Sequence, residues 1–230
     1  MDMAYTLIYL AVLMIVVVWW LVKQTVSLRP WVAAPAADTV RSEGVRSPMT
    51  EAALPSSKLA LGVFLAVATS LFALFISAYS IRMEYGDWRP MPEPMMLWIN
   101  SGILVLSSAF LQYAWNSAKR QNEAGTKFGV LAGGSLALAF VIGQLLAWQQ
   151  LSDGGYGIAE NPANAFFYTL TGVHAIHLAG GIFALLKTVR RVWRNDSSSA
   201  SVELGVELCT IYWHYLLAIW VILFSFMLTT

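Results

Sequence analysis

Charged side chains are scarce in this 230-residue chain, where Asp, Glu, Lys and Arg together make up 12% of the positions. A soluble domain carries about 25%, whereas hydrophobic residues fill 58% of this sequence. The composition therefore excludes an ordinary soluble domain and predicts an integral membrane protein. A single cysteine, Cys209, excludes a disulfide framework and a cysteine-rich metal site. The sequence has no glycine-rich phosphate loop and no basic stripe, so nucleic acid is not an expected partner.

The sequence instead contains several long apolar stretches without charged residues. A transmembrane helix needs about 20 apolar residues, because every backbone N–H and C=O must be paired inside the segment. The stretches that meet this test are residues 5–22, 59–81, 95–115, 128–148, 164–186 and 207–228. We therefore predict an all-α membrane protein with six transmembrane helices.

The six stretches are unevenly spaced along the chain. The first is followed by its positive charge, Lys23, whereas a secretory signal carries that charge before the apolar run. We interpret residues 1–30 as a retained N-terminal anchor helix. Residues 31–57 are rich in Ala, Pro and Ser, which is typical of a linker. Residues 58–230 are predicted to form a five-helix membrane domain.

The basic residues fall mostly on one side of these spans. The loops after spans one, three and five hold all of them except Arg82 and Arg89. Short cytoplasmic loops keep an excess of Lys and Arg. We therefore predict a multi-pass protein of a bacterial inner membrane, with the linker in the cytoplasm and both termini on the outer, periplasmic side.

Small residues recur at helix-packing spacing in two spans. Gly129, Gly133 and Ala137 form one series, and a second series runs through Gly172, Ala175 and Ala179. Small residues let helix backbones approach closely in lipid. Both stripes are therefore predicted to be close-packed.

All three histidines, His174, His177 and His214, lie inside spans. Neutral imidazole binds haem iron, copper and zinc, so His177 and His214 are candidate axial ligands of a b-type haem, and all three are candidates for a copper or zinc site. Alternatively, they are structural hydrogen-bonding groups. Apart from Glu207, no carboxylate, lysine or arginine lies in a span, which argues against a pump or a charged-substrate transporter.

The residues around the histidines resemble a known family. Phe166 and Phe167, followed by "TGVHAIHLAGG" at 171–181, resemble the paired Phe and the G-x-H-G-x-H-x-x-x-G motif of subunit III of the haem–copper terminal oxidases. The last span is similar to that family's G-F-E and Y-W-H-F patterns. The positions that carry this second match are Glu207, Tyr212, Trp213, His214 and Trp220.

Two further spans share the resemblance. Asn100, with Ser101, Ser107 and Ser108, resembles an Asn-Thr, Leu-rich, Ser-Ser pattern, and Gln144 fits the first position of Q-x-x-E-Y. Intramembrane carboxylates of the family are missing, however. The positions where this chain departs from the pattern are Val67, Ala68, Ala147, Trp148 and Leu217. The chain thus resembles a divergent, six-helix member.

The resemblance implies a non-catalytic subunit of a cytochrome c or quinol oxidase. No redox centre is expected on the chain, because haem and copper belong to the partner catalytic subunit I, which reduces dioxygen. Other oxidase subunits and phospholipid held in a cleft between helix groups are the further expected partners. The polar residues expected to hold helices together or to face that lipid are Asn100, Gln144, His174, His177, Glu207, Trp213 and His214. Two alternatives stay open: an accessory subunit of a nitric oxide reductase, and a b-haem membrane anchor that uses His177 and His214.

Overall fold

The computed structural model of the chain describes residues 56–89, 92, 94–194 and 199–228. The predicted anchor helix, residues 1–30, lies outside the described residues, as does the predicted linker up to residue 55. Five of the six predicted spans therefore fall within the described part of the chain.

The described residues form five helices connected by loops and turns. Their bounds are α2 Ser56–Arg82, α3 Met95–Lys119, α4 Glu123–Asp153, α5 Pro162–Trp193 and α6 Ser199–Leu228. Each is long and apolar enough to cross a membrane. The five spans predicted after residue 58 are thus confirmed in order, and every helix extends beyond its predicted apolar stretch.

Short polar segments end these helices. Between α3 and α4, Gln121 adopts a left-handed conformation with φ 55°, which turns the chain within a few residues. Asn122 then caps α4, since its side-chain oxygen accepts a hydrogen bond from the Gly125 N–H. Asn161 caps α5 in the same way through the Ala163 N–H, and Pro162 opens that helix. Pro is favoured there because its missing N–H would have no partner.

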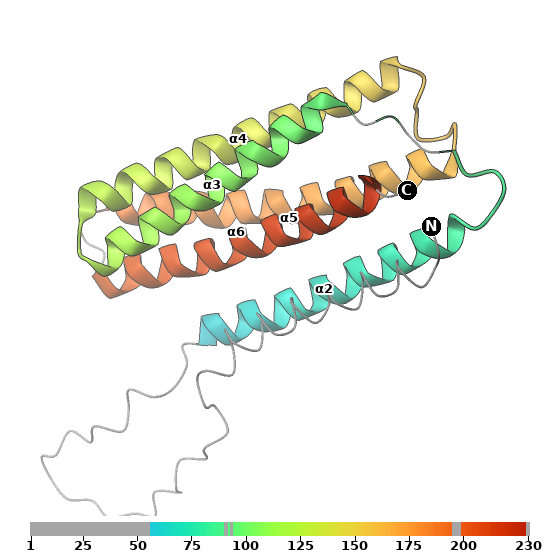
Figure 1. Cartoon of the computed structure of the whole chain (residues 1–230). Helices are drawn as coiled ribbons and strands as arrows, with labels where there is room; N and C mark the ends of the chain where they lie inside the picture. The colour runs from blue at the N-terminus through green and yellow to red at the C-terminus, as the bar shows by residue number, and fades with distance from the viewer. Residues whose placement is uncertain (1–55, 90–91, 93, 195–198, 229–230) are drawn as a thin grey trace, which may run out of the picture. The chain divides into compact units, whose positions relative to one another are not determined.

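The chain divides into two compact units, residues 1–66 and 67–230. Of the first unit, the structure describes only the beginning of α2. In the second, α3 lies beside α4 and α6, while α5 lies beside the same two helices (Figure 1). These four helices therefore enclose a common interior.

Glycine sets the close approach of α3 and α4. A Cβ placed on Gly129 would lie 2.8 Å from the Ala114 Cβ, and one on Gly133 would lie 2.8 Å from the Leu111 Cγ. With Ala137 fully buried, the predicted close packing of this stripe is confirmed.

The predicted stripe of α5 behaves differently. A Cβ on Gly172 would meet no described atom within 4 Å, and Ala179 is exposed. The close approach of α5 lies at Gly181, where a Cβ would come 2.7 Å from the Tyr212 ring and 2.8 Å from the Trp213 ring. The prediction of a close-packed Gly172 stripe is therefore wrong within the described chain, because α5 turns its other face toward α6.

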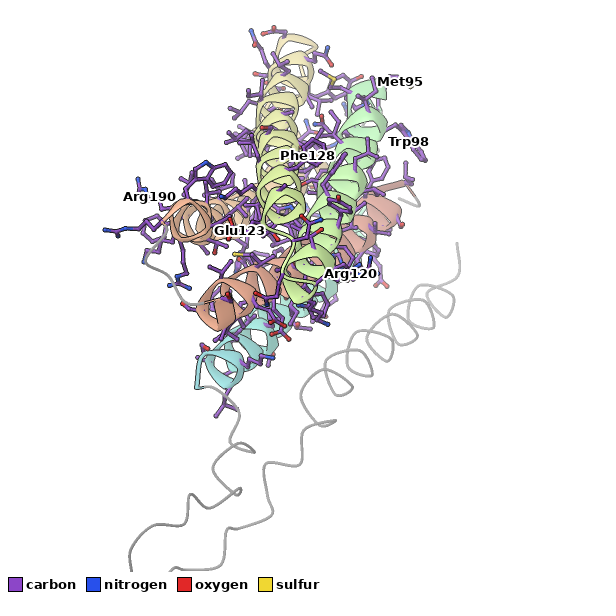
Figure 2. All side chains as sticks on the ribbon, turned by 90° about the vertical axis from the view of Figure 1, so that its left-hand side faces the viewer. Met95, Trp98, Arg120, Glu123, Phe128 and Arg190 are labelled. Atoms are coloured by element: carbon purple, nitrogen blue, oxygen red, sulfur yellow. The ribbon has the colours of Figure 1, made fainter. Side chains whose placement is uncertain are left out.

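Helix α6 is the most enclosed of the five described helices. In its most apolar 18-residue stretch 56% of the residues are buried, whereas the share is 28 to 39% in the other helices. Trp213 and Trp220 are fully buried. The part of α2 after residue 66 meets α6 through Thr69, which shares a hydrogen bond with the Tyr215 hydroxyl. By contrast, Trp98 and Phe128 project from the outside of α3 and α4 (Figure 2), as expected for helices surrounded by lipid.

Candidate functional site

The first predicted site residue, His174, sits in an aromatic cage. It is 1% exposed, and its ring centroid lies 5.4 Å from Trp220, 6.3 Å from Phe140 and 6.4 Å from Phe72. Neither ring nitrogen has a hydrogen-bond partner among the described residues. Helices α2, α4 and α6 thus converge on one imidazole of α5.

His177, one turn further along α5, is engaged locally. Its Nδ1 lies 2.8 Å from the Val173 carbonyl oxygen, and its ring is 5.4 Å from Phe72. The Tyr212 hydroxyl donates to the His177 backbone oxygen at 2.8 Å. This residue therefore helps to join α5 to α6 through its main chain.

The third histidine belongs to a chain of polar contacts between α3 and α6. His214 Nδ1 lies 2.5 Å from the Ser108 hydroxyl, and Nε2 lies 3.0 Å from Gln112 Oε1. Gln112 in turn donates to Asn116 Oδ1 at 3.2 Å. Because an amide oxygen only accepts hydrogen bonds, Nε2 carries the proton, and Nδ1 accepts one from Ser108.

Asn100 and Gln144 lie in the interior enclosed by α3 to α6. Asn100 is fully buried and Gln144 is 4% exposed. A Cβ on Gly143 would collide with Asn100 Oδ1, so the Asn100 side chain rests against the backbone of α4. Within the part of the chain that the structure describes, none of the four polar side-chain atoms of Asn100 and Gln144 has a hydrogen-bond partner.

The remaining two predicted residues are Trp213 and Glu207. Trp213 is fully buried and packs against Gly181. Glu207 is half-buried near the beginning of α6. Glu207 and His214 share a face of α6, but Ser108 and Gln112 engage both ring nitrogens of His214. Two helical turns also separate the two backbones by about 10 Å.

The geometry does not favour metal binding. The described residues contain no group of three or more His, Cys, Asp or Glu side chains that is arranged to hold a metal ion. A haem ligand needs a free imidazole lone pair, whereas Nδ1 of His214 accepts from Ser108 and its other nitrogen donates to Gln112. The residues present therefore do not fit a haem ligated by His177 and His214.

Comparison with known proteins places this arrangement in a family. The sequence model of the family "Cytochrome c oxidase subunit III" matches residues 2–229. The chain belongs to the cytochrome c oxidase subunit III family. It is accordingly a non-catalytic, multi-pass membrane subunit of a respiratory oxidase.

Individual relatives agree with the family model. The chain is 30% identical to "Cytochrome c oxidase subunit 3" of Thermostichus vulcanus over 171 residues, which are 73% of this chain and 84% of the relative. It is 29% identical to the protein of the same name from Synechocystis sp. over 170 residues, 70% of each chain. A "Probable cytochrome c oxidase subunit 3" of Mycobacterium tuberculosis is 27% identical over 158 residues, 67% of this chain and 76% of the relative.

Two of the positions that depart from the expected subunit III pattern, Ala147 and Trp148, lie where α4 faces α5. Ala147 is fully buried. Trp148 donates from its indole N–H to Thr171 Oγ1 at 3.2 Å and accepts from the Tyr168 hydroxyl through its backbone oxygen at 3.3 Å. A neutral contact between α4 and α5 thus lies at the last two positions of the Q-x-x-E-Y pattern that the sequence resembles.

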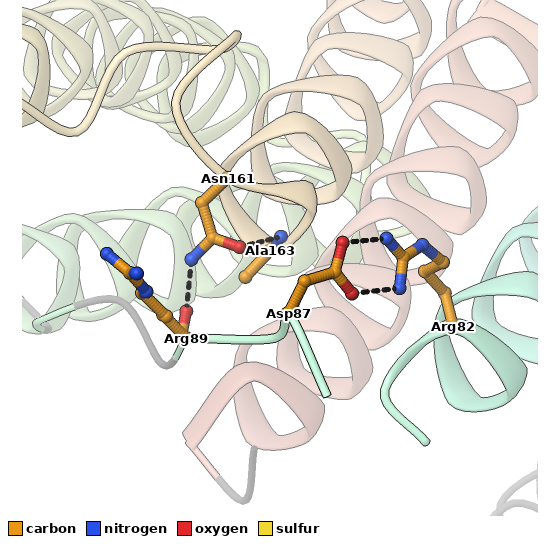
Figure 3. A network of polar contacts seen from close by, with 5 residues as sticks. All are labelled: Arg82, Asp87, Arg89, Asn161 and Ala163. Atoms are coloured by element: carbon orange, nitrogen blue, oxygen red, sulfur yellow. Dashed lines mark hydrogen bonds and ion pairs between the residues drawn. The ribbon is translucent and has the colours of Figure 1, made fainter. Parts of the chain in front are cut away.

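At one end of the subunit III-like bundle, two loops are tied together (Figure 3). Arg82 donates two hydrogen bonds to Asp87, at 2.7 and 2.5 Å, and this arginine holds the pKa of the Asp87 carboxyl below its usual range. Nearby, Asn161 donates to the Arg89 backbone oxygen at 2.6 Å while it caps α5. Asn161 therefore joins the α2–α3 loop to the beginning of α5.

The opposite end of α5 carries a basic hollow. Four cationic side chains line a volume of about 270 Å³: Lys187, Arg190, Arg191 and Arg194. Arg190 points away from the neighbouring helices (Figure 2). Their spacing places them on one helical face, which attracts an anionic group.

Sequence reasoning missed several of these contacts. The hydrogen bond from Gln112 to Asn116 could have been inferred from the sequence, because the two residues are one turn apart on α3. The dual role of Asn161 could not, since its second partner, Arg89, is 72 residues away in the chain.

Proposed function

We propose that this chain stabilises the catalytic haem–copper subunit of a bacterial respiratory oxidase while that subunit reduces dioxygen. The observation that carries the proposal is the family match over residues 2–229. The contacts of the polar site residues support a structural role, because His177, Trp213 and His214 all take part in contacts between α5 and α6 or between α3 and α6.

The same proposal covers the organisation of the chain. Residues 1–30 form an anchor helix joined through the linker 31–57 to the five-helix domain 58–230. Both termini lie on the periplasmic side of the inner membrane. In support, the described basic residues near the α3–α4 and α5–α6 connections share one end of the bundle, whereas Arg82 and Arg89 lie at the other.

Phospholipid is the second proposed partner, held in a cleft between helix groups. The basic hollow of Lys187, Arg190, Arg191 and Arg194 at the end of α5 supports the binding of an anionic phospholipid headgroup but not the position of the cleft, because basic pockets at the cytoplasmic end of membrane helices attract such headgroups. In the purified oxidase, Arg190→Ala combined with Lys187→Ala should lower the amount of retained anionic phospholipid. Arg89→Ala, at the other end of the bundle, is the matched control. Equal retention in both variants would count against lipid binding at the hollow.

The oxidase role is tested by purification of the intact complex from native membranes through a tag on this chain. We expect a haem-containing catalytic subunit to copurify, with dioxygen reduction as its activity. Nitric oxide reduction without oxidase activity would instead establish the alternative accessory role. A stoichiometric Soret band in the chain purified alone, lost on His214→Ala, would replace the structural role with that of a b-haem anchor.

A further inference from the structure

Three buried polar side chains, Asn100, Gln144 and His174, come from three of the helices that enclose the interior, α3, α4 and α5. Asn100 lies against Gly143, the residue before Gln144. Phe140, one turn earlier on α4, has its ring 6.3 Å from His174 and 5.1 Å from Trp220. The pair of rings thus lies against His174, and Phe140 stands one helical turn from Gln144 on the helix that Asn100 contacts.

Trp220 connects the two sides of this cluster. Its ring is 5.4 Å from His174, and its indole N–H donates at 2.9 Å to the hydroxyl of Ser101, the neighbour of Asn100. Because the Trp220 N–H donates to Ser101, it is not available as a donor to Asn100, Gln144 or His174.

These three side chains have unmet hydrogen-bonding capacity. Each amide offers two N–H donors and an oxygen acceptor, and an imidazole offers two polar nitrogens. All six of these side-chain atoms are buried and have no hydrogen-bond partner in the described residues 56–89, 92, 94–194 and 199–228. Two other buried polar side chains on these helices do have partners: Ser107 donates to the Gly133 oxygen at 2.8 Å, and Thr171 donates to the Phe167 oxygen at 2.6 Å.

Unpaired polar atoms are costly in a membrane interior, where bulk water cannot compensate them. Buried water resolves such a cost when two or more polar groups face it. We propose that ordered water molecules bind between Asn100, Gln144 and His174 and bridge α3, α4 and α5. The three side chains then hold the helices together through shared water.

Other occupants fit the cluster less well. Side chains that are 0 to 4% exposed leave no entrance for a phospholipid headgroup. Two amides and one imidazole lack the carboxylate or thiolate that metal sites in proteins usually include. Water alone combines small size with the ability both to donate and to accept.

The direct test is a cryo-EM structure of the complete oxidase at a resolution that shows ordered water. We expect water density within hydrogen-bond distance, about 2.6 to 3.2 Å, of at least two of the three side chains. The Ser107–Gly133 contact is the control in the same map and should show no bridging water. Direct side-chain bonds among the three residues, or an empty interior, would overturn the proposal without affecting the assignment of the chain to an oxidase.

A double-mutant cycle gives a second readout that requires no map. Because shared water couples its partners, the fall in Tm for Asn100→Leu combined with Gln144→Met should be smaller than the sum of the falls for each change alone. The control cycle, Ser107→Ala with Gln144→Met, should be additive. Additive falls in both cycles would show that Asn100 and Gln144 act independently, which contradicts a shared water site. If a variant fails to assemble, the wild-type map still decides.

Discussion

Glycine residues on α5 differ sharply in what surrounds them. At Gly181 an added methyl group would press on the rings of Tyr212 and Trp213, whereas at Gly172 it would meet no described atom within 4 Å. Gly181→Ala should therefore lower the free energy of unfolding by about 1–3 kcal/mol, the usual range for overpacking. Denaturant titration of the chain in detergent micelles measures this change.

Gly172→Ala is the matched control on the same helix. It should be neutral or raise the free energy of unfolding by up to about 1 kcal/mol, because alanine favours a helix more than glycine does. Equal destabilisation by the two changes would mean that the Gly181 contact with α6 is not tight.

The hydrogen bonds of His214 allow a second prediction for single residues. Gln112→Leu removes the acceptor of the His214 Nε2–H and leaves a donor unpaired at membrane depth. We expect the free energy of unfolding to fall by about 1–2 kcal/mol, the range for hydrogen bonds between membrane helices. Asn116→Leu is the control and should cost less than half as much, because Asn116 is exposed and headgroup water replaces it. A larger loss for Asn116→Leu would contradict this order.

At the scale of helices and loops, two asparagines cap the beginning of a helix, but only one of them also bonds to a second loop. Asn122 caps α4 alone, whereas Asn161 caps α5 and also bonds to the Arg89 backbone. Loss of a cap costs about 0.5–2 kcal/mol. Asn161→Ala should therefore speed amide exchange both at the beginning of α5 and in residues 83–89, while Asn122→Ala affects only α4. Exchange measured by mass spectrometry distinguishes them, and an unchanged loop in Asn161→Ala would contradict the link.

The loop that contains Asp87 should also respond to acid. Because its pKa is lowered in the folded chain, the Asp87–Arg82 contact stabilises the loop above the unfolded pKa of about 4. That contribution is lost as the pH falls through the lower folded pKa. A spin label at Glu84→Cys should therefore become more mobile below pH of about 4. Adding Asp87→Asn should remove this response, and persistence of the response would assign it to another group.

The elements that could be predicted from the sequence are those set by local composition. Apolar length alone placed α2 to α6 in order, and the spacing of Gly129 and Gly133 correctly indicated close packing. The same spacing failed for Gly172, because a stripe of small residues does not reveal which face of α5 turns toward α6. The aromatic cage of His174 depends on Phe72, Phe140 and Trp220, which come from three other helices and share no local pattern.

At the scale of the molecule, charged and neutral polar side chains lie at different depths along the helix bundle. Charged groups gather at the two ends of the bundle, and the interior keeps neutral polar residues such as Asn100, Gln144 and His174. Ala147 and Leu217, where the resemblance drawn from the sequence leads us to expect carboxylates, are neutral as well.

The division of charge between the ends predicts the orientation of the molecule in the membrane. Arg89 lies at the end with few basic residues and Arg120 at the basic end, next to Lys119. Because cytoplasmic loops keep the excess of Lys and Arg, a membrane-impermeant maleimide should label Arg89→Cys in intact spheroplasts. Arg120→Cys should react only after the membrane is permeabilised. The parent chain is the control, since the thiol of its only cysteine, Cys209, is buried and should stay unlabelled in both conditions. Labelling of Arg120→Cys alone in intact spheroplasts would invert the proposed topology, because it would place the basic end of the bundle outside the cell.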